Sequence, residues 1–169
     1  ERTAASLSKS VITTRSLTKA YGLDDIRVGW IIAEAELAER LQRLADLFMP
    51  TMAFPSERLA LEALKRADAM LEEGLELLNT NFQLVEACID NHPELSWHPP
   101  ETGTVSFVKV ENISVEQLVE HLEEEYDTLV VPGHFFGMPD YFRIGWGMDT
   151  DDLSEGLINL VQALEDLEE

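Results

Sequence analysis

An apolar repeat through the middle of the chain restricts its possible folds more than any other feature of the sequence. Apolar residues recur there every three or four positions: Ala60, Leu64, Ala67, Leu71, Leu75, Leu78, Phe82 and Val85. This spacing lines one side of an α-helix. We expect a helix over residues 57–90, capped by Ser56, with Gly74 as the candidate for a bend. Such a helix would be about 51 Å long, too long for the core of one small domain. It therefore predicts a connector between two domains.

Strands and helices are predicted on both sides of this connector. Before it, β-branched and apolar residues indicate strands at 11–17 and 27–33, and leucines at helical spacing indicate a helix at 34–48. Pro50 and Pro55 then break the helical pattern. After it, the same criteria predict strands at 104–110, 128–131 and 141–147, and helices at 114–125 and 151–167. Helices that alternate with short strands indicate an α/β protein.

The negative charge of the chain is concentrated in one part of it. There are 33 acidic residues against 12 basic ones, a net charge of −21, yet residues 1–56 carry seven of each. We interpret the excess in residues 57–169 as adaptation to high salt, which screens the mutual repulsion of surface carboxylates. The alternative is an ordinary acidic protein. Under either interpretation, this acidic surface would repel nucleic acid and anionic membranes, so neither is an expected partner.

Three further features bear on the location of the protein. The apolar runs are only a few residues long, whereas a membrane span needs roughly 20. The first residues lack the basic end and apolar run of a signal peptide. Cys88 is the single cysteine, so no internal disulfide is possible. We therefore expect a cytoplasmic protein without a membrane partner.

A lysine stands where the first predicted strand gives way to a loop. Lys19 follows Ser16 and Thr18 closely and precedes Arg27 by eight residues. A lysine that is partly desolvated can form a Schiff base with an aldehyde cofactor. A serine hydroxyl and an arginine guanidinium can bind the phosphate of such a cofactor. The alternative is a solvated surface lysine.

An isolated arginine lies in the last predicted strand. Arg143 is flanked by Phe142 and Ile144, and no other lysine or arginine lies between Lys109 and the end of the sequence. Such an arginine either forms a structural ion pair or binds the carboxylate of a ligand. The residues alone leave both possibilities open.

The remaining polar clusters predict no chemistry. His121, Glu124 and Glu125 share the helix predicted at 114–125, but no third metal ligand is evident outside it, so we expect a solvated face and no metal site. His92 and His98 flank a segment that we expect to be a surface loop.

Two segments resemble one enzyme family. Ser-Leu-Thr-Lys-Ala-Tyr-Gly-Leu at 16–23, followed by Ile-Arg-Val-Gly-Trp at 26–30, resembles the lysine segment of the class I/II aminotransferases, which are pyridoxal-phosphate enzymes of fold type I. Pro-Gly-His-Phe-Phe-Gly at 132–137, followed by Phe-Arg-Ile-Gly at 142–145, resembles their substrate-arginine segment. The resemblance covers essentially all of this chain and about half of a full enzyme.

The resemblance implies a division of the chain and a set of roles. Residues 1–55 would end the large cofactor-binding domain and its sheet, and residues 56–169 would form the interdomain helix and the small α/β domain. Lys19 would bind the aldehyde of pyridoxal 5'-phosphate and later move a proton. The implied cofactor-binding residues are Ser16, Thr18, Lys19 and Arg27. Arg143 would clamp the α-carboxylate of the substrate, and no metal is implied.

The resemblance also implies a reaction and an assembly. The intact enzyme would transfer an amino group between an amino acid and a 2-oxo acid, as a homodimer. Two alternatives stay open: a pyridoxal-phosphate decarboxylase or lyase on the same scaffold, and a non-catalytic fragment or effector-sensing module.

Overall fold

The computed structural model describes residues 3–49 and 51–168. Within them the chain divides into two compact units, with the division between Gly74 and Leu75. We call the part up to Gly74 the N-terminal unit and the part from Leu75 the C-terminal unit. The expected division into residues 1–55 and 56–169 stays a prediction.

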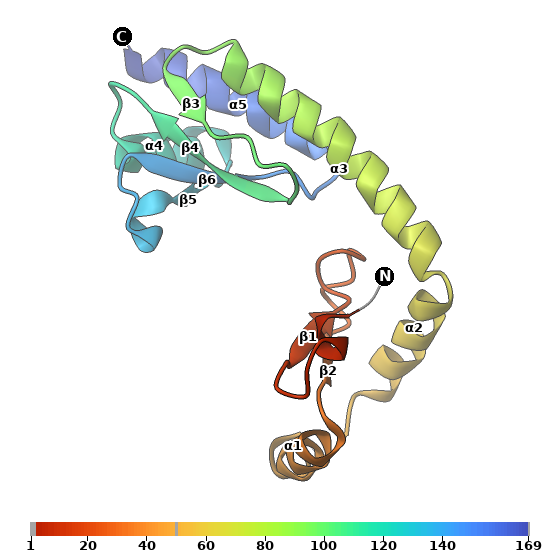
Figure 1. Cartoon of the computed structure of the whole chain (residues 1–169). Helices are drawn as coiled ribbons and strands as arrows, with labels where there is room; N and C mark the ends of the chain where they lie inside the picture. Colours follow the sequence, from red (N-terminus) through yellow and green to blue (C-terminus); the bar gives the residue numbers. More distant parts are fainter. Residues whose placement is uncertain (1–2, 50, 169) are drawn as a thin grey trace. The chain divides into compact units, whose positions relative to one another are not determined.

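The N-terminal unit contains a two-stranded antiparallel sheet and two helices (Figure 1). Its elements are the 3₁₀ turn η1 (Ala4–Ser6), strands β1 (Thr13–Ser16) and β2 (Gly29–Ile32), and helices α1 (Ala35–Phe48) and α2 (Phe54–Lys65). Thr13 lies opposite Ile32, and Ser16 lies opposite Gly29. Both strands and α1 were predicted, although the strands are shorter than the ranges expected.

The small core of the N-terminal unit lies between α2 and the loop that joins the strands. Leu17, Val28, Ala60 and Ala63 are buried together, with Met70 and other half-buried residues around them. The loop therefore packs on the first half of the apolar repeat. By contrast, α1 buries none of its residues.

The helix predicted over residues 57–90 consists of two helices. They are α2, which ends at Lys65, and α3 (Ala67–Asp90), and Arg66 between them has non-helical backbone angles (φ −113°, ψ 16°). The bend was expected at Gly74, which instead lies inside α3. The cap was expected at Ser56, but Ala53 holds that position. Pro55 is tolerated in the first turn because its missing N–H would have no helical partner there.

The C-terminal unit is a four-stranded antiparallel sheet with helices on one face (Figure 1). The strand order is β3 (Leu95–Trp97), β4 (Val105–Val110), β6 (Tyr141–Gly145) and β5 (Val131–Pro132). Helices α4 (Val115–Tyr126) and α5 (Thr150–Glu168) and the 3₁₀ turn η2 (Gly133–Phe136) complete it. The predicted helices and the strands at 104–110 and 141–147 are confirmed, each to within a few residues.

Two predictions for the C-terminal unit are wrong. The segment between His92 and His98 contains β3, which pairs with β4, so it is not a plain surface loop. Three residues are too few to show a periodicity in the sequence. The strand expected at 128–131 is wrong in its extent, because β5 consists of Val131 and Pro132 alone, both paired with β6.

The alternation of side chains gives the sheet two different faces. Leu95, Val108, Phe142 and Ile144 join α3, α4 and α5 in one buried core. The neighbouring positions point to the opposite face, because successive strand residues alternate. We call this the outer face of the sheet, and its half-buried residues include Phe107, Lys109, Val131, Tyr141 and Arg143.

One buried polar side chain connects α3 to the segment after β6. Asn81 is fully buried. Its amide nitrogen donates to the backbone carbonyls of Trp146 (3.0 Å) and Met148 (2.9 Å), and its carbonyl oxygen accepts from the Thr150 hydroxyl (2.8 Å).

Among the helices of the described ranges, none combines the length and apolarity that crossing a membrane requires.

Candidate functional site

The loop between β1 and β2 is held by backbone hydrogen bonds and by two buried side chains. The N–H of Leu17 donates to the carbonyl of Val28 (3.0 Å), and the N–H of Leu23 donates to the carbonyl of Leu17 (3.0 Å). Leu17 is completely buried and Val28 nearly so. These contacts fix both arms of the loop that carries the predicted lysine.

The polar residues of this loop are less buried than its apolar ones. Leu17 is completely buried, whereas Ser16 is exposed and Thr18 half-buried. Lys19 is exposed at the next position. Gly29 lies opposite Ser16, where an added Cβ would stand 2.8 Å from the Arg15 carbonyl oxygen. A larger residue at position 29 would push the two strands apart.

Arg27 adopts an unusual backbone conformation on the second arm of the loop. Its φ of 54° lies in the left-handed region, which costs energy for a residue with a side chain. Its N–H (3.3 Å) and its guanidinium (3.4 Å) both donate to the carbonyl of Asp24. Within residues 3–49 and 51–168, no carboxylate lies within 4.0 Å of the Arg27 guanidinium or the Lys19 amine. Both cations are therefore available to an anionic or carbonyl ligand.

The predicted cofactor-binding residues thus lie in one segment, residues 16–27, which we call the lysine loop. Ser16 ends β1, and Thr18 and Lys19 follow it on the first arm of the loop. Arg27 joins them because it precedes Val28, which is hydrogen-bonded to Leu17.

Arg143 belongs to the C-terminal unit. It lies on the outer face, between Phe107 of β4 and Val131 of β5. Its guanidinium carbon lies 5.3 Å from the centre of the Phe136 ring. In the part of the chain that the structure describes, no carboxylate comes within 4.0 Å of this guanidinium. The structural ion pair that was one alternative for Arg143 is thus absent from those residues.

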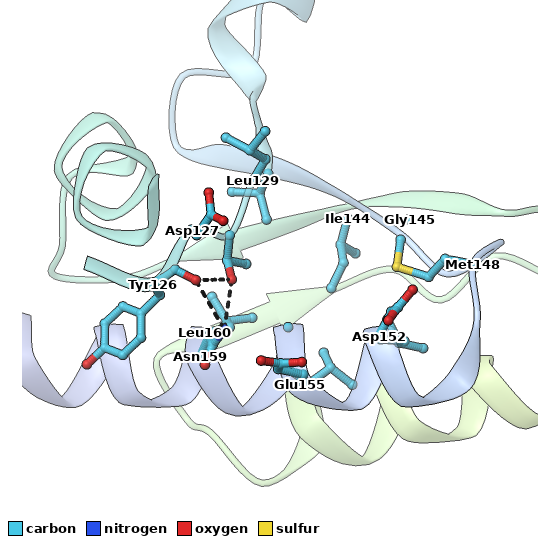
Figure 2. Close-up of a pocket in the computed structure, with 15 residues that line it drawn as sticks. Tyr126, Asp127, Leu129, Ile144, Gly145, Met148, Asp152, Glu155, Asn159 and Leu160 are labelled. Atoms are coloured by element: carbon cyan, nitrogen blue, oxygen red, sulfur yellow. Dashed lines mark hydrogen bonds between the residues drawn. The ribbon is translucent and has the colours of Figure 1, made fainter. Parts of the chain in front are cut away.

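A cavity of about 430 Å³ in the C-terminal unit contains none of the predicted site residues (Figure 2). It lies between residues 126–130 and the first half of α5. The pairing of β5 with β6 begins only at Val131. Residues 127–130, which come before it, are not paired with β6 and line the cavity instead. Its lining includes three carboxylates and no lysine or arginine: Asp127, Asp152 and Glu155. An anionic cofactor or substrate is therefore disfavoured in this cavity.

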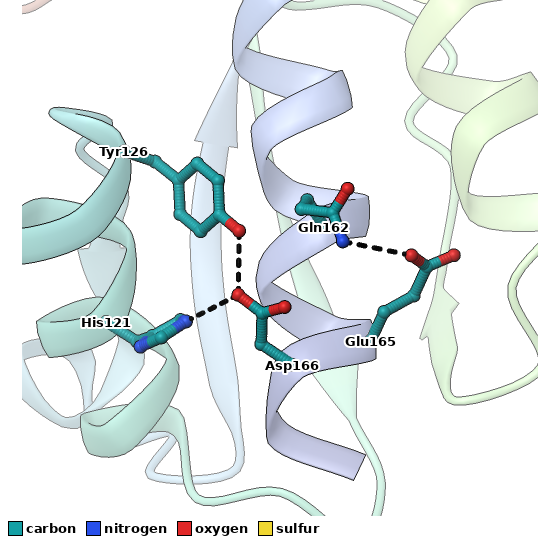
Figure 3. Close-up of polar contacts among 5 residues, drawn as sticks. All are labelled: His121, Tyr126, Gln162, Glu165 and Asp166. Atoms are coloured by element: carbon teal, nitrogen blue, oxygen red, sulfur yellow. Dashed lines mark hydrogen bonds and ion pairs between the residues drawn. The ribbon is translucent and has the colours of Figure 1, made fainter. Parts of the chain in front are cut away.

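A second polar cluster that the sequence did not indicate connects α4 to α5 (Figure 3). One carboxylate oxygen of Asp166 accepts from the Tyr126 hydroxyl (2.7 Å) and lies 3.0 Å from Nε2 of His121. The hydrogen bond to Asp166 raises the pKa of Tyr126 to about 12. Hydrogen bonds from His121 and then Tyr126 lower the pKa of Asp166. The cluster is a contact between two helices, and it contains none of the residues of the lysine loop.

Comparison with known proteins identifies the family. Residues 2–160 match the family described as aminotransferase class I and II. The chain belongs to this family. Its members are enzymes, and their cofactor is pyridoxal phosphate. The resemblance expected from the two sequence segments is thereby confirmed, together with the cofactor.

Among curated proteins, the chain is similar to the capreomycidine synthase of Streptomyces vinaceus, with 30% identity over 156 residues. That match covers 91% of this chain and 40% of the synthase. A probable aspartate/prephenate aminotransferase of Rickettsia typhi is 23% identical over 172 residues, which are 95% of this chain and 43% of the relative. The chain therefore spans about two fifths of the length of these relatives.

Solved structures confirm the fold of this aminotransferase-family chain. A pyridoxal-phosphate-dependent aminotransferase from Streptococcus suis superposes with a TM-score of 0.89 at 28% identity, over 95% of this chain and 43% of that structure. A pyridoxal-phosphate-dependent cyclase, OrfR, superposes with a TM-score of 0.83 at 28% identity, over 92% and 43%. The α/β fold expected from the sequence is that of the fold type I aminotransferases.

The lysine loop fits the chemistry of pyridoxal phosphate. An aldehyde needs an amine, which Lys19 supplies without a carboxylate partner in the described ranges. A phosphate ester needs hydrogen-bond donors and positive charge, which the hydroxyls of Ser16 and Thr18 and the Arg27 guanidinium supply. No acidic residue lies between Ser16 and Lys19, and the two acidic residues of the loop, Asp24 and Asp25, are exposed.

Proposed function

We propose that this chain is part of an enzyme that transfers an amino group between an amino acid and a 2-oxo acid. The observation that carries the proposal is the lysine loop. It presents, on arms that Leu17 and Val28 hold together, two hydroxyls, an amine and a guanidinium, and neither cation has a carboxylate within 4.0 Å among the described residues. Membership of the aminotransferase family supports it.

The residues of the loop then have separate tasks. Lys19 would hold the cofactor through its aldehyde, and once the amino group of the substrate has displaced the lysine, the freed amine would move a proton at the Cα of the substrate. Ser16, Thr18 and Arg27 hold the phosphate and so fix the orientation of the cofactor. When bound, pyridoxal phosphate supplies an electron sink for the charge left at Cα.

Arg143 is proposed to bind the α-carboxylate of the substrate. A guanidinium can form two parallel hydrogen bonds with a carboxylate, which fixes the orientation of the substrate as well as its position. The absence of an internal ion pair at Arg143, within the described residues, supports this role. The carboxylate is common to all amino acids, so Arg143 does not select among side chains.

Unburied apolar surface supports a larger assembly around the N-terminal unit. Helix α1 buries no residue, and Leu47 and Phe48 are 78% and 79% exposed. A two-stranded sheet is only marginally stable without further strands or packing. We propose that further protein of the large cofactor-binding domain covers these surfaces. A homodimer, which is typical of the family, is the assembly that we propose, in the cytoplasm of a salt-adapted cell.

The names of two relatives favour a second candidate function. The capreomycidine synthase and the cyclase OrfR are not named as aminotransferases, although they share 30% and 28% of residues with this chain. A ring-forming reaction with the same cofactor, or a decarboxylation or elimination, would use the same lysine loop.

Product analysis distinguishes these functions. The intact enzyme is incubated with pyridoxal phosphate and each of the twenty amino acids, with and without 2-oxoglutarate, and products are identified by mass spectrometry. Amino transfer predicts glutamate and a new 2-oxo acid, formed only when 2-oxoglutarate is present. A cyclised, decarboxylated or eliminated product that forms without 2-oxoglutarate would replace the proposal. The Lys19→Ala variant is the control and should give no product in either case.

A further inference from the structure

The guanidinium of Arg143 lies close to an aromatic ring that comes from another element. Phe136 belongs to η2, and its ring centre is 5.3 Å from the guanidinium carbon. That distance is within the range of a favourable cation–π contact. Phe136 is 49% exposed, so burial alone gives no strong reason for an aromatic residue at this position.

A second aromatic ring supports Phe136 from the side. The rings of Phe107 and Phe136 are 5.1 Å apart with planes at 69°, an edge-to-face arrangement. Phe107 lies directly opposite Arg143 in the pairing of β4 with β6. The two rings and the arginine therefore form one contact group on the outer face, with Phe136 in contact with both other members.

The backbone that carries Phe136 is tightly constrained. Gly133 is buried, and an added Cβ would stand 2.2 Å from the Met138 carbonyl oxygen and 2.3 Å from that of Tyr141. The N–H of Met138 donates to the Gly133 carbonyl (3.0 Å), and the N–H of Gly137 donates to the His134 carbonyl (3.1 Å). At the other end of the turn Pro132 is paired with β6. The backbone position from which the Phe136 side chain extends is therefore fixed.

A ring in this position restricts the arginine without competing for its hydrogen bonds. An aromatic face attracts the charge of a guanidinium, whereas its N–H groups still need oxygen partners. A long arginine side chain has many rotamers, and a ligand that must select one of them binds more weakly. A contact that holds the guanidinium before the ligand arrives reduces that loss.

We propose that Phe136 is a positioning residue, which holds the Arg143 guanidinium in place for the carboxylate of the substrate. The proposal rests on the role proposed above for Arg143 and adds a second residue to it. Phe135, the neighbouring phenylalanine, has no such role, because it is 72% exposed and its ring packs on His134 with centres 4.2 Å apart.

The test compares three variants of the intact enzyme. Phe136→Leu should raise KM about fivefold for the amino acid and for the 2-oxo acid, as expected for a lost cation–π contact. It should leave kcat within about twofold and the absorbance of bound cofactor unchanged. Phe136→Tyr keeps the ring and should restore KM, and Phe135→Leu is the matched control with KM as in the wild type.

A double-mutant cycle separates positioning from packing. If Phe136 acts through Arg143, then Phe136→Leu should raise KM no further when Arg143→Gln is already present. An unchanged KM in Phe136→Leu would overturn the proposal, as would an equal rise in Phe136→Tyr. If Arg143→Gln itself leaves KM unchanged, the role proposed for Arg143 is wrong. If Arg143→Gln raises KM and Phe136→Leu does not, only the positioning role is wrong.

Discussion

Asn81 and Trp146 are joined by a buried hydrogen bond across 65 residues of sequence. The Asn81 side-chain nitrogen donates to the Trp146 carbonyl at 3.0 Å, and its second hydrogen goes to the carbonyl of Met148. Trp146 directly follows β6, the strand that carries Arg143. The interaction therefore fixes the end of that strand to α3.

Replacement of Asn81 by alanine should destabilise the C-terminal unit by about 2–4 kcal/mol, because the buried carbonyl of Trp146, the part-buried carbonyl of Met148 and the Thr150 hydroxyl lose their partner. Urea unfolding followed by tryptophan fluorescence measures the change. Asn79→Ala is the matched control on the exposed side of the same helix and should stay within about 0.5 kcal/mol of the wild type. An equal loss of stability in Asn79→Ala would contradict the proposed contribution of the Asn81 hydrogen bonds.

Lys19 should carry the cofactor in the intact enzyme, because its exposed amine lies on the loop with Ser16 and Arg27. Borohydride reduction of the cofactor-loaded enzyme, followed by peptide mapping, should find the pyridoxyl group on Lys19. Lys9 and Lys65 are internal comparisons in the same digest. A label on either of them in place of Lys19 would refute the assignment.

Arg143→Lys should weaken substrate binding and leave cofactor binding unchanged. An ammonium cannot reproduce the two parallel hydrogen bonds of a guanidinium, and charged hydrogen bonds of this kind correspond to an increase in KM of roughly 10–100-fold. Steady-state kinetics with varied amino acid measures KM, and the absorbance of bound cofactor measures occupancy. Kinetics equal to the wild type would return Arg143 to a structural role.

The contact between α4 and α5 should depend on pH through Asp166 and Tyr126. The pKa of Asp166 is lowered in the fold, so its contribution to stability is present above the unfolded pKa near 3.8 and is lost as pH falls through the folded value. The pKa of Tyr126 is raised to about 12, so its contribution is complete below its usual value of 10.0 and is lost as pH rises towards 12.

The melting temperature of Asp166→Asn should therefore fall below that of the wild type by the largest amount between about pH 5 and pH 10. The gap should close in acid and in strong alkali. Glu123→Gln, an exposed change on α4, controls for the loss of one negative charge. A gap that is constant from pH 3 to pH 10 would contradict the ionic role of Asp166.

The C-terminal unit should gain stability with salt. From residue 75 onwards the sequence has 21 acidic residues, against Lys109 and Arg143 as its only lysine and arginine. Raising salt from 0.01 M to 1 M shortens the screening length from about 30 Å to 3 Å, which weakens the repulsion among these carboxylates. The fluorescence of Trp97 and Trp146 during thermal unfolding reports on this unit.

A variant with glutamines at positions 123, 124 and 125 should show a smaller rise in melting temperature over the same range of salt, because it has fewer charges to screen. A wild-type melting temperature that does not respond to salt would remove the interpretation as salt adaptation.

Several parts of this protein were visible in the sequence because they depend on residues that are close together in the chain. The helical spacing of apolar residues predicted α1, α4 and α5, and the β-branched and apolar residues of 104–110 and 141–147 predicted β4 and β6. The lysine loop was visible for the same reason, since Ser16, Thr18, Lys19 and Arg27 lie within 12 consecutive residues.

Tertiary structure decided the features that depend on distant partners. Strand β3 exists because three residues pair with β4, and β5 is short because residues 128–130 leave β6. The position of the break at Arg66 was not indicated by any helix-breaking residue. Asn81 was one polar residue among many on a long helix until Trp146 and Thr150 came within hydrogen-bond distance. Phe136 gained its contact with Arg143 only because η2 folds over the outer face of the sheet. Periodicity records which side of an element is apolar, whereas these contacts are set by the packing of one element on another, which no local pattern contains.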